Sequence, residues 1–82
     1  IEFSNISKKF LKNCQKEDAT RIVEKVELLS SNPYIRESVK LAGSDNSFRI
    51  RVGKYRIIYK IKNDIILITE IGKRGNIYKK RK

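Results

Sequence analysis

The stretch from Phe48 to Lys60 reads FRIRVGKYRIIYK and constrains the fold more than any other part of the chain. Apolar and basic residues largely alternate on both sides of Gly53-Lys54. Such alternation is typical of β-strands with one buried face, and a two-residue loop that begins with glycine suits a type II′ hairpin turn. The sequence therefore predicts an antiparallel hairpin with strands at residues 49–52 and 55–61.

This predicted turn also determines which residues face each other. It places Arg51 opposite Arg56, with Arg49 two positions along on the same face and no acidic residue between the three in the sequence. Like charges directly opposite each other destabilise a sheet, whereas an opposite-charge pair would contribute roughly 0.2–1 kcal/mol. Folding does not require this arrangement, and an anion bound between the guanidinium groups would relieve the repulsion. The alternative is that the arginines simply extend into water, with their stems covering apolar surface.

The apolar residues of the two strands share the other face of the hairpin and are expected in the core. They are Phe48, Ile50, Val52, Tyr55, Ile57 and Tyr59. A third strand is expected at residues 65–71, after a turn at Asn63-Asp64. Because its sequence IILITEI is apolar at nearly every position, both of its faces should be covered, as in a central strand.

The first part of the chain predicts a short strand followed by two helices. Residues 1–4 alternate as a strand does, and Ser4 or Asn5 can cap a helix in which Ile6, Phe10 and either Leu11 or Cys14 recur at helical spacing. The second helix should begin near residues 16–18, with acidic residues in its first turn, where the helix dipole favours them. Its apolar stripe comprises Ala19, Ile22, Val23, Val26 and Leu29.

These elements predict an α+β fold, in which an N-terminal strand and a helical hairpin pack on one face of a small antiparallel β-sheet. The 82 residues are expected to form a single domain, residues 1–82. No apolar run approaches the length that spans a membrane, and no signal peptide is apparent, which favours a cytoplasmic protein without a membrane partner.

The positive charge is concentrated in the part of the chain that contains the sheet. The net charge is +11, but residues 1–48 hold 8 Lys/Arg and 7 Asp/Glu, a balance of +1, whereas residues 49–82 hold 12 Lys/Arg and 2 Asp/Glu, a balance of +10. Charge added only for solubility would be spread over the chain. The asymmetry therefore indicates a polyanionic partner, most often a nucleic acid.

The residue types exclude several kinds of chemistry. The chain has no histidine and only one cysteine, Cys14, so histidine-based catalysis and zinc ligation are excluded, and no metal or cofactor is expected. A ribonuclease without metal needs groups that stabilise a phosphorane and groups that transfer protons. A cluster of arginines performs the first task, and Tyr78 is the best candidate for the second. The alternative for Tyr78 is an aromatic residue that packs on an edge strand.

The run KLAGSDNSFRIRVGKYRIIYKI, followed by an apolar strand and IGKRGNIY, resembles the RelE/ParE superfamily of toxins from toxin–antitoxin pairs. The resemblance extends from Lys40 to Tyr78, and the preceding helices match in kind. It implies the RelE-like microbial ribonuclease fold and the activity of an mRNA interferase. Such an enzyme enters the ribosomal A site and cleaves mRNA by attack of the 2′-hydroxyl on the phosphodiester, without a metal or cofactor.

The resemblance also implies site residues. Arg49 and Arg51 match two basic residues of the family's first catalytic strand, and Arg56 matches the arginine that holds the scissile phosphate. Arg74 matches the arginine assigned to charge stabilisation and leaving-group protonation, and Tyr78 matches the C-terminal tyrosine that stacks on the substrate or aids proton removal. Further RNA contacts are expected from the basic residues Lys54, Lys60, Lys73, Lys79 and Lys80.

The chain departs from the family where lysines are common and it has Arg49 and Arg51. A lysine can act as a base once its pKa is lowered, but an arginine in practice cannot. Either Tyr78 is then the base, or the reaction depends mainly on electrostatics.

The resemblance further implies a cognate antitoxin, acidic or amphipathic, that covers the basic face. Two alternatives remain: a ParE-like inhibitor of DNA gyrase that cleaves no RNA, and a basic RNA-binding module without catalysis.

Overall fold

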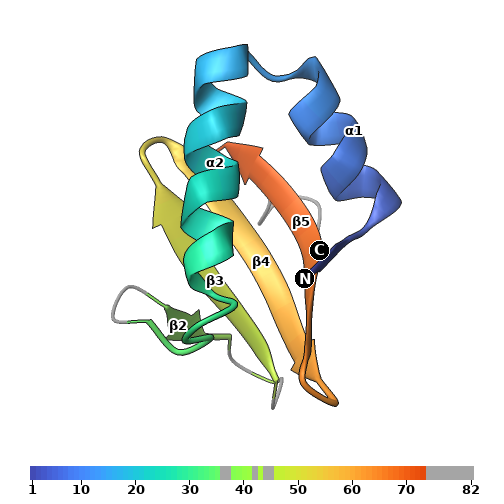
Figure 1. The fold of residues 1–82 in the computed structure, drawn as a ribbon, viewed down its shortest axis with the longest axis vertical. Helices are drawn as coiled ribbons and strands as arrows, with labels where there is room; N and C mark the ends of the chain where they lie inside the picture. Colours follow the sequence, from blue (N-terminus) through green and yellow to red (C-terminus); the bar gives the residue numbers. More distant parts are fainter. Residues whose placement is uncertain (36–37, 42, 44–45, 74–82) are drawn as a thin grey trace.

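A computed structural model describes residues 1–35, 38–41, 43 and 46–73. The elements in chain order are β1 (Glu2–Phe3), α1 (Asn5–Asn13), α2 (Lys16–Leu28), β2 (Val39–Lys40), β3 (Ser47–Val52), β4 (Tyr55–Lys62) and β5 (Ile65–Lys73). The strands form one five-stranded sheet in the order β1-β5-β4-β3-β2 (Figure 1). This α+β arrangement confirms the predicted fold class.

The hairpin of β3 and β4 has the predicted register. Arg51 pairs with Arg56, Val52 with Tyr55 and Arg49 with Ile58. Gly53 has a φ of 57°, whereas Lys54 has no positive φ, as expected where only the first loop residue is left-handed. A Cβ at Gly53 would lie 3.3 Å from Nη2 of Arg21 on α2, the end of an exposed side chain that can shift, so the positive φ is what favours glycine here.

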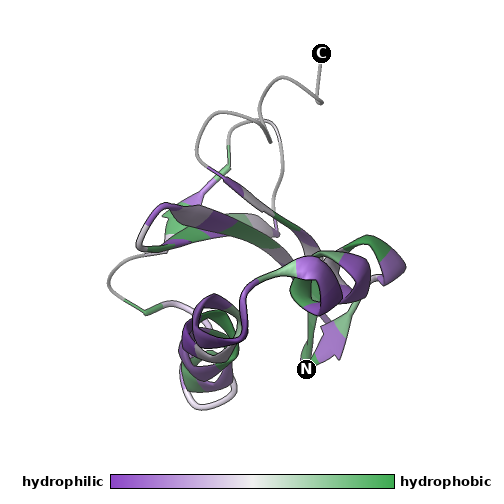
Figure 2. Cartoon of the chain, turned by 90° about the horizontal axis from the view of Figure 1, so that it is seen from above, coloured by the Kyte–Doolittle hydropathy of each residue, from purple (hydrophilic) through white to green (hydrophobic). Residues whose placement is uncertain are grey.

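Both helices cover the same face of the sheet (Figure 2). The core lies between these layers and includes the apolar face predicted for the hairpin. Its buried members are Ile22, Val26, Leu29, Phe48, Ile50, Tyr55, Ile57, Tyr59, Ile66, Ile68 and Ile71. Tyr59 is fully buried, and its hydroxyl is satisfied by donating a hydrogen bond of 2.7 Å to the carbonyl oxygen of Pro33.

Helix α1 begins as predicted but presents a different face to the sheet. The Ser4 side chain caps it by accepting a hydrogen bond of 3.1 Å from the Ser7 backbone N–H. Ser7 itself is buried, and its hydroxyl donates to the carbonyl oxygen of Ile68 at 3.0 Å. Because these bonds turn Ser7 towards β5, Ile6 remains 62 % exposed, although its spacing with Phe10 suggested a core position.

Neither helix of the described residues is long and apolar enough to cross a membrane.

The sheet is mixed rather than purely antiparallel. β1 runs parallel to β5, with Glu2 paired to Leu67 and Phe3 to Ile68. The two strands are separated by most of the chain, so no tight turn imposes an antiparallel arrangement on them. Their pairing makes β5 an internal strand, as its nearly continuous apolar sequence predicted. The expectation that both of its faces are covered holds only in part, because both helices lie on one face and Leu67 on the other face is half-buried.

Candidate functional site

Three arginines lie together on the face of the sheet opposite the helices. We call this surface, defined by Arg49, Arg51 and Arg56, the arginine face. Arg51 and Arg56 are cross-strand partners, and Arg49 lies two residues before Arg51 on the same side of β3. Arg51 is exposed and Arg49 half-buried, whereas Arg56 is only 8 % exposed. The cluster thus has a buried floor and an accessible rim, an arrangement suited to holding an anion by several donors.

The sequence did not reveal that a carboxylate lies on this face. Glu70 of β5 pairs with Ile58, which is 1 % exposed and pairs on its other side with Arg49. A row from Arg49 through Ile58 to Glu70 therefore crosses three strands. Arg49, Arg56 and Glu70 each make an interaction with another group in the structure. The arginine face therefore combines positive charge with one carboxylate among the described residues of β3, β4 and β5.

A β-bulge brings Glu70 to the arginine face. Tyr59 pairs with Ile68 but the adjacent Ile58 pairs with Glu70, so Thr69 is an extra residue in β5. Its hydroxyl donates a hydrogen bond of 3.1 Å to the carbonyl oxygen of Ile58. Strict alternation after Ile68 would direct Glu70 into the core, and the bulge reverses its direction. A carboxylate at an expected core position was the available signal.

The predicted RNA-binding lysines do not all lie on the arginine face. Lys60 is exposed there, because it lies on β4 in the same alternation as Arg56. Lys54 is in the hairpin turn, and Lys73 pairs with Tyr55, whose side chain faces the helices. The other predicted site residues, Arg74, Tyr78, Lys79 and Lys80, lie outside the described residues. Their roles, and those of the three arginines, stay predictions.

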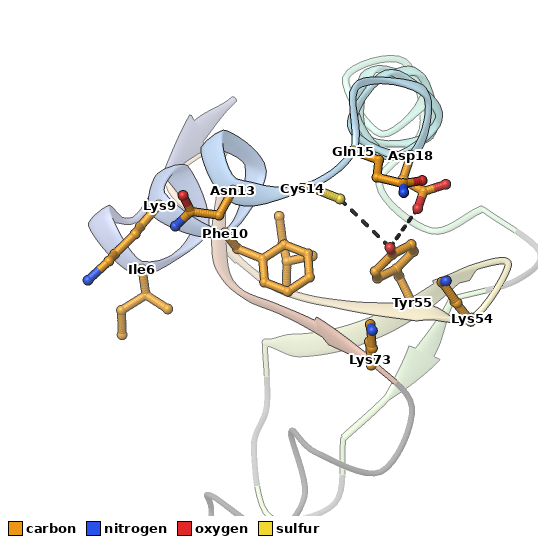
Figure 3. A pocket seen from close by; sticks show the side chains of 11 residues that line it. Ile6, Lys9, Phe10, Asn13, Cys14, Gln15, Asp18, Lys54, Tyr55 and Lys73 are labelled. Atoms are coloured by element: carbon orange, nitrogen blue, oxygen red, sulfur yellow. Dashed lines mark hydrogen bonds between the residues drawn. The ribbon is translucent and has the colours of Figure 1, made fainter.

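A pocket of about 500 Å³ lies on the helix side of the sheet (Figure 3). We call it the α1 pocket. Its lining residues are Ile6, Lys9, Phe10, Asn13, Cys14, Gln15, Asp18, Lys54, Tyr55, Ile71 and Lys73. At its inner end the Tyr55 hydroxyl donates a hydrogen bond of 2.7 Å to Oδ2 of Asp18, and the Cys14 thiol donates to the same hydroxyl at 3.8 Å.

This network changes the acidity of Tyr55. The hydrogen bond to Asp18, then burial, then the contact with Cys14 raise the pKa of the Tyr55 hydroxyl well above its usual value. Tyr55 therefore stays protonated and ties the hairpin to the start of α2.

Among the described residues, no group of three or more histidine, cysteine, aspartate or glutamate side chains could hold a metal ion. Independence from metal stays a prediction.

The chain matches a known family along almost its whole length. Residues 1–78 match the family described as the ParE toxin of type II toxin–antitoxin systems. The chain belongs to the RelE/ParE superfamily of toxins. This confirms the resemblance found in the sequence. A relative from Methanocaldococcus jannaschii named RelE1 is 36 % identical over 76 residues, which cover 87 % of this chain and 84 % of the relative.

Solved structures of RelE proteins share the fold. The RelB–RelE antitoxin–toxin complex from Methanococcus jannaschii superposes with a TM-score of 0.80 at 26 % identity, covering 98 % of each chain. The RelE–RelB complex from Pyrococcus horikoshii gives a TM-score of 0.80 at 28 % identity, covering 92 % of this chain and 93 % of the other. The isolated Escherichia coli RelE toxin, at 19 % identity, gives 0.78 and covers 98 % of this chain and 90 % of its own. Together they establish a RelE-type fold.

Replacing Tyr55 by phenylalanine tests the network at the end of the pocket. We expect Tyr55→Phe to lower the free energy of unfolding near neutral pH, because the hydrogen bond to a charged carboxylate is lost. A raised pKa favours the protonated folded state. Its contribution is complete below the unfolded pKa of about 10 and disappears as the pH rises through the folded pKa.

The difference in stability between wild type and Tyr55→Phe should therefore shrink at strongly alkaline pH. Urea unfolding at about pH 7 and about pH 11 measures it. The control is Tyr34→Phe, since Tyr34 is largely exposed. A difference that stays constant or grows with pH would show that the tyrosine hydroxyl is not held protonated by the fold.

Proposed function

We propose that this RelE/ParE toxin is a ribosome-dependent, metal-independent endoribonuclease that cleaves mRNA in the ribosomal A site. The observation that carries the proposal is the position of Arg51 directly opposite Arg56, with Arg49 beside them. Like charges directly opposite each other on a sheet repel, and a bound phosphodiester would offset that repulsion. Arginine is suited to the task because its planar donor fork matches phosphate oxygens.

The proposed reaction is transesterification followed by release of a 5′ end. The 2′-oxygen attacks the adjacent phosphorus as it loses its proton, and the bond from phosphorus to the 5′-oxygen breaks as that oxygen gains a proton. The products carry a 2′,3′-cyclic phosphate and a 5′-hydroxyl. The arginines supply donors aimed at the phosphorane, whose extra negative charge is largest in the transition state.

Removal of the 2′-hydroxyl proton needs a group other than the arginines of β3, because a cationic guanidinium has no acceptor for a proton. The resemblance assigns charge stabilisation and leaving-group protonation to Arg74, and stacking on the substrate or aid in proton removal to Tyr78. Glu70 adds a second candidate for the base, since the bulge places its carboxylate on the same face as Arg56. An ionised carboxylate is an acceptor, as removal of the 2′-hydroxyl proton requires.

The proposed partners are the translating ribosome with its mRNA and a cognate antitoxin. Two of the structurally similar proteins were solved as complexes of RelE with RelB, which supports an antitoxin for this chain. An acidic or amphipathic antitoxin suits a toxin with a net charge of +11. Toxin and antitoxin would act in the cytoplasm, where the ribosomes are.

Removing a rim arginine tests the ribonuclease proposal. We expect Arg51→Ala to lower the rate of mRNA cleavage by about 10²–10³, as is typical when one donor to a transition-state charge is lost. Mapping RNA 5′ ends on translating ribosomes measures the rate. The matched control is Lys62→Ala. Lys62 is exposed, as Arg51 is, but it lies at the end of β4, whereas Arg56, the cross-strand partner of Arg51, lies near the start of that strand.

The same preparation distinguishes the alternatives. A gyrase inhibitor of the ParE kind would trap cleaved DNA in a gyrase assay and leave translation intact. A non-catalytic RNA-binding module would bind RNA with a steep dependence on salt without new RNA ends. Cleavage by Arg51→Ala at the wild-type rate would contradict the proposed site.

Two conservative substitutions identify the base. If Glu70 removes the proton, Glu70→Gln should lower the cleavage rate by about 10²–10⁴ and remove the acidic limb of the pH–rate profile, whereas Tyr78→Phe should retain that limb. The control is Asp64→Asn in the exposed turn after β4. An unchanged acidic limb in Glu70→Gln would assign proton removal elsewhere, with Tyr78 as the remaining candidate.

A further inference from the structure

We propose that a groove between α2 and β3 holds the mRNA strand next to the scissile phosphate, with Arg21 and Lys25 binding a neighbouring phosphate. The inference rests on the proposed function, because it assumes that RNA reaches the arginine face. The groove has a volume of about 450 Å³. It is lined by Arg21, Glu24, Lys25 and Leu28 of α2 and by residues 51–53 of the hairpin. We call it the α2–β3 groove.

The α2 wall of the groove is one continuous face of the helix. Its four residues follow each other at i, i+3, i+4 and i+7, so their side chains lie on the same side of α2. Arg21, Glu24 and Leu28 are exposed and Lys25 is half-buried. The core uses another face of the helix, on which Ile22 is fully buried. The groove face is therefore accessible to a partner.

The guanidinium group of Arg21 lies at the hairpin turn. Its Nη2 is 3.3 Å and its Cζ 3.9 Å from the position that a Cβ on Gly53 would occupy. Gly53 follows directly on Val52, the last residue of β3. A planar donor fork from α2 is thus placed beside the end of the strand that carries the rim of the arginine face.

Arg51 belongs to both surfaces. On the arginine face it is the cross-strand partner of Arg56, and it also lines the α2–β3 groove. The described pairing of β2 with β3 ends at Arg49, so no described strand flanks Arg51 on the side away from β4. An RNA strand whose phosphate is held at the arginine face can therefore continue over this edge of the sheet towards Arg21.

The charge of the groove suits a phosphodiester chain. Its described lining residues include three cations, Arg21, Lys25 and Arg51, and one carboxylate, Glu24. An arginine fork donates two hydrogen bonds to phosphate oxygens. The carboxylate opposes the strand, so its removal should strengthen binding.

Two neighbouring groups refine this assignment. Arg21 also lines a smaller cavity of about 270 Å³ that contains Asp18, but Oδ2 of Asp18 accepts the hydrogen bond from Tyr55. Leu28 is 54 % exposed in the groove and offers apolar surface that a base can cover. Continuity through Arg51 favours the cleaved strand over ribosomal RNA as the occupant, because the strand held at Arg51 is the one that is cut.

The experiment measures binding of uncleavable RNA to the full chain without ribosomes. The probes are labelled 2′-O-methyl oligouridylates: a trinucleotide that fills the arginine face, and a chain of about eight nucleotides that also enters the groove. The 2′-O-methyl group replaces the attacking hydroxyl, so binding is measured without cleavage. The Kd is determined over a range of salt concentrations, because the slope of log Kd against log salt reports how many phosphates are neutralised.

We expect Arg21→Ala to raise the Kd of the longer probe about three- to tenfold at low salt, as one charge-assisted contact is lost. The salt slope should fall by about 0.7, the value for one phosphate of a single strand. Arg21→Lys should retain the slope because it keeps the charge, and Glu24→Gln should lower the Kd. The trinucleotide should bind Arg21→Ala within about twofold of wild type.

The matched control is Lys16→Ala. It removes the same charge from an exposed position of the same helix, but Lys16 does not line the groove. Both probes should bind this variant within about twofold of wild type, with an unchanged salt slope.

Several outcomes would overturn the inference. An unchanged slope in Arg21→Ala would show that Arg21 contacts no phosphate, and an equal loss in Lys16→Ala would indicate attraction by net charge alone. Equal weakening of both probes would place Arg21 at the scissile phosphate. A loss of ribosome affinity with unchanged probe binding would assign the groove to ribosomal RNA. Because the probes cannot be cleaved, failure of the ribonuclease proposal would appear only in the cleavage assay.

Discussion

The Gly53-Lys54 turn is the constraint on which the rest of the structure depends. A glycine with positive φ closes a two-residue loop, and that loop sets a register in which Arg51 opposes Arg56. Because side chains alternate across a strand, the same register sends Ile50 and Ile57 into the core. One local conformation thus fixes the apolar face that holds the helices and the charged face that carries the candidate site.

Different structural features shape the two faces of the sheet. On the arginine face, the bulge at Thr69 directs Glu70 outward and lets β5 resume its inward alternation at Ile71. On the helix side, the hydrogen bond of Tyr55 to Asp18 holds the hairpin tip against α2 and forms the inner end of the α1 pocket. The bulge in β5 therefore lies where the substrate is proposed to bind, as bulges often do.

The sequence predicted what depends on local chemistry and missed what depends on tertiary contacts. The hairpin register followed from turn chemistry, and the helix bounds followed from capping and periodicity. The bulge was missed because the strand at residues 65–71 was treated as continuously apolar, although the acidic residue two positions after Ile68 was a signal. The exposure of Ile6 was missed because the buried hydrogen bonds of Ser7, which rotate α1, join residues distant in sequence.

A double-mutant cycle between Arg51 and Arg56 tests the central claim most directly. Threonine replaces each arginine singly and together, and urea unfolding gives the coupling free energy at low salt, without and with a bound RNA oligonucleotide. The account predicts an unfavourable coupling in the free protein, which becomes favourable when RNA is bound. A coupling that is favourable in the free protein, or that RNA leaves unchanged, would contradict it.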